Sequence, residues 1–188
     1  SGTYAIINIS ENAFQSHVDH GDASPGEPVP GMAGKKFTAD CTVVDVKELI
    51  DTIIVPSNGV TVTSTAVLVS GVSYELEASG TYKFVNWATA TIPDLGYADA
   101  RFSYRIPSSY NSTGSPAWID GANLIPGYPN YLQIWVNGNS FTWGTGYSET
   151  HTYVSNFTGQ GSTVSFKIVD NAYGDNVGSL TVKIYRYN

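Results

Sequence analysis

From about residue 58 onward, apolar and polar residues alternate in short runs that are separated by turn residues. Alternation with a period of two predicts half-buried β-strands. We expect strands over residues 60–69, 74–78, 81–85, 98–104, 132–136, 164–169 and 180–187. Ser79-Gly80 and Asn137-Gly138 are predicted hairpin turns, and Asn-Gly is the stronger signal. The pattern therefore predicts an all-β protein, an antiparallel β-sandwich of the jelly-roll or galactose-binding-like type.

The first 38 residues follow a different pattern. Residues 4–9 predict a short strand, and Ser10 is a predicted cap for a small helix over residues 11–18. A run rich in Pro and Gly follows this helix and is typical of a linker. We expect an N-terminal appendage over residues 1–38 and a β-sandwich domain over residues 39–188. Its first strands fall between residues 41 and 55, where β-branched residues continue.

Composition agrees with a β-rich extracellular domain. Only 13% of the residues are charged, whereas hydrophobic residues reach 41% and tyrosine is abundant. The net charge of −7 excludes the basic footprint of a nucleic-acid-binding protein, and no apolar run is long enough for a membrane span. Cys41, the single cysteine, is either a free thiol or has lost a partner in a missing N-terminal stretch. We expect a secreted or cell-surface protein.

Oxygen-bearing side chains gather between the last two predicted strands. Asp170, Asn171, Asp175 and Asn176 lie within seven residues, and Gly174 allows the backbone to curl. Calcium prefers carboxylate, amide and carbonyl oxygens, and a hard donor set without His or Cys favours calcium over zinc. The alternative is an ordinary polar hairpin, since Asp, Asn and Gly are also the common turn residues.

This loop resembles the calcium loop of the PA-IL-type bacterial galactose lectins. That family has an Asp, a short turn, two adjacent amide side chains, then Gly-Ser and an alternating strand; Asp175-Asn176-Val177-Gly178-Ser179-Leu180 matches the second part. The resemblance covers about residues 60–188. It implies that Asp170, Asp175 and Asn176 are side-chain ligands of calcium and that Ala172 is a carbonyl ligand. In that family the sugar hydroxyls bind the calcium directly, so the resemblance also implies carbohydrate binding.

Asp99 stands alone between two alanines in a predicted apolar strand. Burying a carboxylate is costly, so Asp99 requires a partner. We expect it to be a further calcium ligand; the side chain of Arg101 or Arg105 is the alternative partner.

Aromatic residues offer candidate sugar contacts. Trp118, in a loop after Pro116, and Trp143, beside Gly144, are the predicted stacking residues, and Asn171 is a predicted polar contact; burial in the core is the alternative for tryptophans. Another short loop could hydrogen-bond a ligand or simply be solvated; it contains Tyr147, Glu149 and His151. Asn111 and Asn156 begin sequons and are the predicted glycosylation sites.

The N-terminal zone offers one more candidate metal site. Residues 9–22 resemble a short module of secreted bacterial proteins, in which His17, His20 and Asp22 could ligate a metal or form a polar helix end. No nucleophile elbow or phosphate-binding loop is present, and we expect no enzymatic activity. The predicted function is a calcium-dependent carbohydrate-binding module. The alternative is a structural or adhesive subunit of a filament or surface layer, with structural calcium, that binds neighbouring subunits through its N-terminal zone.

Overall fold

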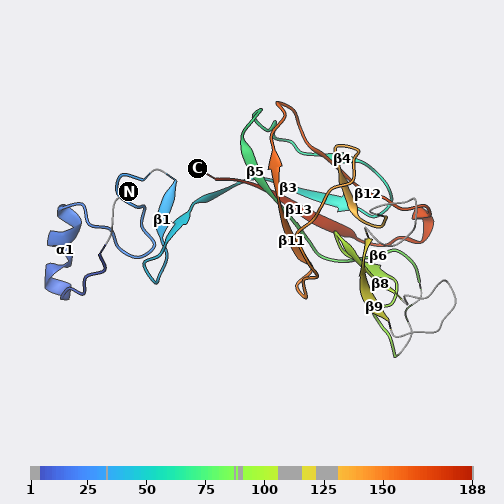
Figure 1. Ribbon diagram of the computed structural model, residues 1–188, viewed down its shortest axis with the longest axis horizontal. Coiled ribbons are helices and arrows are strands. Elements are labelled where there is room, and N and C mark those ends of the chain that lie inside the picture. Colours follow the sequence, from blue (N-terminus) through green and yellow to red (C-terminus); the bar gives the residue numbers. More distant parts are fainter. Residues whose placement is uncertain are drawn as a thin grey trace. The chain divides into compact units, whose positions relative to one another are not determined.

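The computed structural model describes residues 5–32, 34–86, 88, 91–105, 116–121 and 131–187 (Figure 1). The chain divides into two compact units, one formed by Ser1–Glu48 with Arg186–Asn188 and the other by Leu49–Tyr185. Residue 4 of the predicted first strand and Asn111, a predicted glycosylation site, lie outside the described residues. Among the residues that the structure describes, no helix is both long and apolar enough to cross a membrane.

The smaller unit contains the predicted helix and one small hairpin. Helix α1 spans Glu11–Asp19, and Ser10 is its N-cap residue, although the Ser10 side chain makes no capping hydrogen bond. The helix is therefore confirmed, whereas residues 5–9 form no strand, because a strand needs a partner to satisfy its backbone and this segment is exposed. Strands β1, Lys35–Phe37, and β2, Val43–Asp45, pair antiparallel and are joined by residues 38–42, so this hairpin crosses the predicted boundary at residue 38. The compact unit consequently extends ten residues beyond the predicted linker, to Glu48.

The larger unit is built almost entirely from strands. These are β3 Lys47–Pro56, β4 Val62–Thr63, β5 Ser73–Ser79, β6 Tyr82–Lys83, β7 Tyr97–Ala98, β8 Phe102–Arg105, β9 Ala117–Asp120, β10 Ile134–Val136, β11 Thr152–Thr158, β12 Ser165–Ile168 and β13 Ser179–Tyr187. They form sheets with the orders β11-β5-β13-β3, β10-β12-β4 and β6-β7-β8-β9. The predicted all-β, antiparallel, sandwich-like class is confirmed.

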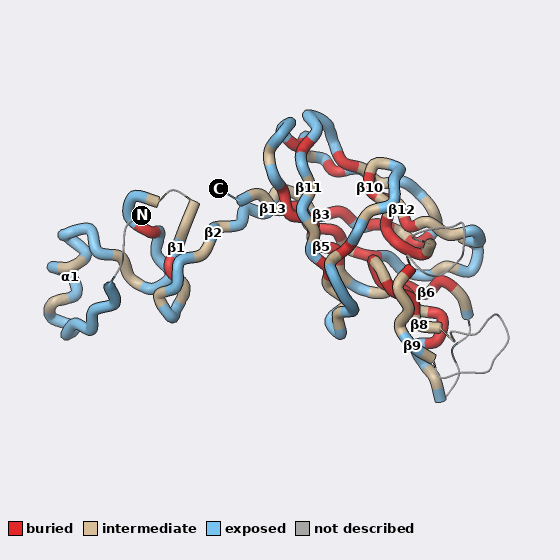
Figure 2. Tube along the Cα trace, in the orientation of Figure 1, coloured by how far each residue is buried: buried red, intermediate tan, exposed pale blue. Residues whose placement is uncertain are grey.

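All three sheets of the larger unit contribute to one hydrophobic cluster. In β13, Leu180, Val182 and Ile184 are buried and alternate with partly exposed residues, as the sequence pattern predicts. Phe166 of β12 and Tyr82 of β6 belong to the same cluster. Figure 2 shows the buried parts of the tube concentrated in these strands, while no residue of α1 is buried. Fully burying one such aliphatic or aromatic side chain contributes about 1.5–3 kcal/mol, so this cluster is the main source of stability.

The two predicted hairpin turns have different outcomes. Asn137 and Gly138 both have positive φ, and Val136 and Asn139 exchange two backbone hydrogen bonds across them, so this tight turn is confirmed. The prediction for Ser79-Gly80 was wrong. Strand β5 ends at Ser79 in one sheet, and β6 begins at Tyr82 in another. Gly80 has a φ of +97° and donates its backbone N–H to the carbonyl of His151, which directs the chain out of the first sheet.

Residues 98–104 form a hairpin and not the single strand that was predicted. Ala98 of β7 pairs with Ser103 of β8, and the chain reverses at residues 99–101. The cause is Asp99, whose Oδ1 accepts hydrogen bonds from the backbone N–H groups of Arg101 and Phe102. The residues around Asp99 alternate as they would within one continuous strand, so the sequence pattern does not reveal that this side chain closes a turn.

Candidate functional site

The predicted calcium loop joins β12 to β13 and is folded around the side chain of Asp170. Asp170 Oδ1 accepts hydrogen bonds from the hydroxyl of Tyr131 at 2.6 Å, from the backbone N–H of Asn171 at 2.6 Å and from that of Ala172 at 3.3 Å. The Tyr131 hydroxyl also contacts Asn171 Oδ1. Tyr131 was not among the predicted site residues, because it lies 39 positions from Asp170 in the chain and no local pattern connects them.

The other half of the loop packs against the segment that follows β3. A short 3-10 helix, Tyr173–Asp175, places the Tyr173 ring so close to Gly59 that a Cβ on residue 59 would lie 2.7 Å from it. Asn176 donates from Nδ2 to the carbonyl of Ser57 at 2.7 Å. Its Oδ1 is buried, and no hydrogen-bond partner for this oxygen exists among the described residues.

The loop thus contains one buried oxygen without a hydrogen-bond partner among the described residues and several exposed residues whose oxygen atoms could bind a metal. Asn171, Ala172 and Asp175 are exposed, and Asp170 is half-buried. Within the described part of the chain, no group of three or more His, Cys, Asp or Glu side chains is arranged to hold a metal. A cation at this loop would therefore depend on two carboxylates together with amide and carbonyl oxygens. That donor set fits calcium in its chemistry, since calcium accepts neutral oxygens as readily as carboxylates.

Asp99 is fully buried, and its carboxylate is hydrogen-bonded to two backbone N–H groups and two side chains, neither of which is an arginine. Oδ1 accepts two backbone hydrogen bonds within the turn, while Oδ2 accepts from His151 Nδ1 at 2.9 Å and from the Tyr153 hydroxyl at 2.8 Å. Both oxygens are occupied, so coordination of calcium would require these bonds to break. Burial, together with the charge and hydrogen bond of Asp99, raises the pKa of Tyr153 and keeps its hydroxyl protonated as a donor.

Arg101 is committed to a different network. Its guanidinium donates twice to Asp120 Oδ2, at 2.9 and 2.6 Å, and also to the carbonyls of Trp143 and Gly144. Gln133 donates to Asp120 Oδ1 and to the carbonyl of Arg101. These bonds tie β9 and the start of β10 to the turn between β7 and β8.

An aromatic cluster surrounds His151. Trp118 lies in β9 and not in a loop as predicted; its ring centroid is 4.5 Å from that of His151, 5.5 Å from Tyr104 and 5.6 Å from Tyr147. Tyr147 stacks on Trp118 with an interplanar angle of 26° and is 43% exposed. Burial, and then the charges of Asp99, Glu149 and Asp94, raise the pKa of Tyr147. The structure therefore brings Trp118 together with Tyr147 and His151 of the predicted loop, and Tyr147 is the accessible ring.

Trp143 occupies the core and does not face a ligand. Its side chain is fully buried, its Nε1 donates to the carbonyl of Ile134 at 2.8 Å, and its ring meets Phe141 edge-on. The prediction that Trp143 contacts sugar is therefore corrected. A neighbouring glycine does not distinguish a buried tryptophan from an exposed one.

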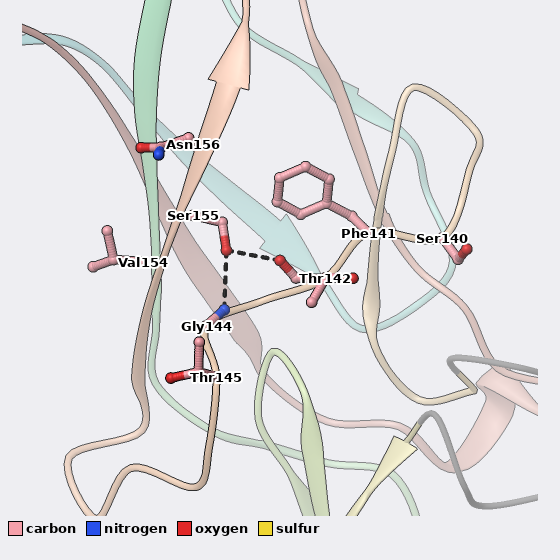
Figure 3. A pocket seen from close by; sticks show the side chains of 8 residues that line it. All are labelled: Ser140, Phe141, Thr142, Gly144, Thr145, Val154, Ser155 and Asn156. Carbon is pink, nitrogen blue, oxygen red and sulfur yellow. Dashed lines mark hydrogen bonds between the residues drawn. The ribbon is translucent and has the colours of Figure 1, made fainter.

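A shallow groove of about 500 Å³ lies between β11 and the segment that precedes it (Figure 3). Its lining contains no charged residue and comprises Ser140, Phe141, Thr142, Gly144, Thr145, Val154, Ser155 and Asn156. Ser155 Oγ holds the two walls together, because it accepts from the N–H of Gly144 and donates to the carbonyl of Thr142. Asn156, a predicted glycosylation site, is exposed on β11 at this groove.

In the smaller unit, His17 Nδ1 contacts Asp22 Oδ2 at 2.7 Å at the end of α1, while His20 is exposed. This geometry is that of a polar helix end. Comparisons of the chain with protein-family models, with curated proteins and with solved structures found no match. The resemblance to the PA-IL-type galactose lectins therefore stays a prediction that rests on the residues of the loop.

Proposed function

We propose that this chain is a secreted or cell-surface β-sandwich domain that binds calcium at the loop from Asp170 to Asn176 and serves carbohydrate recognition. The proposal rests on the environment of the Oδ1 atom of Asn176. It is buried and has no donor among the described residues, and it belongs to a loop that also contains two carboxylates.

A cation resolves the electrostatic problem of this loop. Leaving a buried acceptor unsatisfied costs about 1–3 kcal/mol, and this seven-residue loop contains two carboxylates and no Lys, Arg or His. The bond from Asn176 Nδ2 to the Ser57 carbonyl holds the amide in place, so its oxygen keeps one direction. Asp170, Asp175 and Asn176 would hold the ion with side-chain oxygens and Ala172 with its carbonyl. Bound calcium would supply a positive charge with free coordination positions for hydroxyl groups.

Carbohydrate is the ligand class that this arrangement suits best. Asn171, Ala172 and Asp175 are exposed, so the outer side of the loop is accessible to a ligand. Vicinal hydroxyls of a sugar are neutral oxygen donors of the kind that calcium accepts. The resemblance of the loop to the calcium loop of galactose lectins supports the same ligand class.

The proposal predicts that calcium stabilises the protein by binding the native state only. After chelation and dialysis, we expect 1 mM calcium to raise the melting temperature, whereas 1 mM magnesium raises it less because it demands octahedral geometry. Asp175→Ala should abolish the shift, and Asp94→Asn, an exposed acid outside the loop, should retain it. An unchanged wild-type melting temperature in calcium would contradict the site. If calcium stabilises the protein but no glycan on an array binds it, the calcium site is supported and carbohydrate recognition through the ion is rejected.

A second candidate function, as a structural or adhesive surface subunit, is favoured by the apolar surface near the N-terminus and by one sheet edge. Ile6 is 71% exposed and Ile7 is 54% exposed, and β11, an end strand of its sheet, carries no charged residue. Exposed apolar segments and uncharged edges pair with other chains. As a structural or adhesive surface subunit, the protein would self-associate, and removal of residues 1–30 would stop this. Sedimentation of both forms tests it, since a monomeric full-length protein at high concentration would exclude a filament.

A further inference from the structure

Tyr147 is an exposed aromatic ring that the fold holds rigidly. It stacks on Trp118, and its edge contacts are T-shaped, with Phe102 at 5.5 Å and His151 at 5.9 Å between ring centroids. An exposed ring that is fixed from behind and from the sides loses little conformational entropy when a ligand covers it. This rigidity distinguishes Tyr147 from an isolated aromatic residue on a solvated loop.

His151 provides a polar group at the border of this ring. Its Nδ1 is bonded to the fully buried Asp99, and its backbone has a φ of +50°, a conformation that residues other than glycine seldom adopt. Because an ionised carboxylate only accepts hydrogen bonds, Nδ1 is the donor in this contact, and in the neutral imidazole Nε2 is then an acceptor. The imidazole side chain is 22% exposed, so a ligand can reach the ring.

We propose that Tyr147, backed by Trp118 and bordered by His151, is a stacking platform for a neutral pyranose. The apolar C–H face of a pyranose suits the exposed ring, and a hydroxyl of the same sugar can donate to His151 Nε2. Nearby Asp94 and Glu149 disfavour anionic ligands, so neutral glycans bind and uronic acid polymers do not. The inference rests on the carbohydrate-binding part of the proposed function, and it requires no calcium because no contact of the platform involves the loop from Asp170 to Asn176.

Affinity gel electrophoresis of the full chain tests the platform. The gels contain hydroxyethylcellulose, laminarin or galactomannan as neutral probes and polygalacturonate as the acidic probe, each with calcium or with chelator. We expect at least one neutral polysaccharide to retard the wild type under both conditions and polygalacturonate to leave its mobility unchanged. Tyr147→Ala should weaken that retardation by about tenfold or more, since one aromatic contact carries much of a small interface. Tyr147→Phe should retain it, and Tyr187→Ala, an exposed tyrosine of the smaller unit, is the matched control.

The failure of the platform is distinguishable from the failure of calcium-dependent recognition. Retardation that disappears with chelator or in Asp175→Ala, but persists in Tyr147→Ala, overturns the platform and leaves the calcium site as the sugar contact. Absence of retardation by every neutral probe overturns the platform as well, whatever the melting temperature does in calcium. A circular dichroism spectrum of Tyr147→Ala that matches the wild type ensures that lost binding reflects the lost ring and not unfolding.

Discussion

Replacing Asp99 by alanine should destabilise the larger unit by about 3–5 kcal/mol, because several buried donors lose their acceptor together. The two best-buried donors are the N–H of Phe102 and the hydroxyl of Tyr153, and each costs about 1–3 kcal/mol when it is left unsatisfied. The imidazole of His151 and the N–H of Arg101 lie nearer the surface, where water can replace part of the bond. This sum is a large part of the stability of an ordinary domain.

Asp99→Asn is the milder companion variant. Its remaining oxygen can still accept from the two backbone N–H groups of the turn. Its amide N–H groups then face the Tyr153 hydroxyl and His151 Nδ1, both of which can become acceptors by rotating a hydroxyl or changing a tautomer. We expect a loss of about 1–2 kcal/mol, which leaves enough folded protein to measure if the alanine variant does not fold.

Urea unfolding, followed by tryptophan fluorescence with calcium and with chelator, measures both variants. Because Asp99 acts through the turn and through His151 and Tyr153, its loss should lower the free energy of unfolding equally under the two conditions. A variant that loses stability only when calcium is present would show that Asp99 is a ligand of the ion and that these hydrogen bonds do not account for its effect. Unchanged stability of Asp99→Ala under both conditions would show that the four hydrogen bonds are not formed.

Two further predictions test the core and the response to pH. Trp143→Ala should cost about 3–5 kcal/mol, measured by urea unfolding, and loss of less than 1 kcal/mol would show that the ring is not buried as described. The pKa of Asp51 is affected by burial, which raises it, but hydrogen bonds from Thr65, Ala66 and Thr52 outweigh this and hold the pKa below its usual value. A lowered folded-state pKa contributes stability that is present above about pH 4 and is lost as the pH falls further. The difference in unfolding free energy between wild type and Asp51→Asn should therefore shrink between pH 5 and pH 2, and a difference that grows on acidification would contradict it.

The sequence was sufficient where local patterns determine structure. Helix α1 has an extended Ser10 before it and an acid in its first turn, and both are local signals. Strand β13 alternates without interruption, and the Asn137-Gly138 turn depends on two adjacent residues that tolerate positive φ. Each of these elements could be predicted within one or two residues of its observed bounds.

The elements that could not be predicted depend on contacts between distant residues. Strand β11, whose residues are Thr152–Thr158, pairs along its whole length with β5, which precedes it by more than 70 positions. Residues 97–105 alternate like one strand, yet the side chain of Asp99 reverses the chain. The partners of that side chain, His151 and Tyr153, lie 52 and 54 positions away. The aromatic cluster around Tyr147 likewise joins β8, β9 and the loop before β11, so no single segment of sequence reveals it.

Isothermal titration calorimetry of the full chain, after removal of bound ions by chelation, measures directly whether the loop from Asp170 to Asn176 binds calcium. We expect one calcium ion per chain for the wild type, and much weaker binding for Asn176→Ala, which removes the buried oxygen. Asp94→Asn should bind as the wild type does. Absence of a calcium-binding isotherm for the wild type, or a stoichiometry and affinity that Asn176→Ala leaves unchanged, would contradict calcium binding at the loop from Asp170 to Asn176.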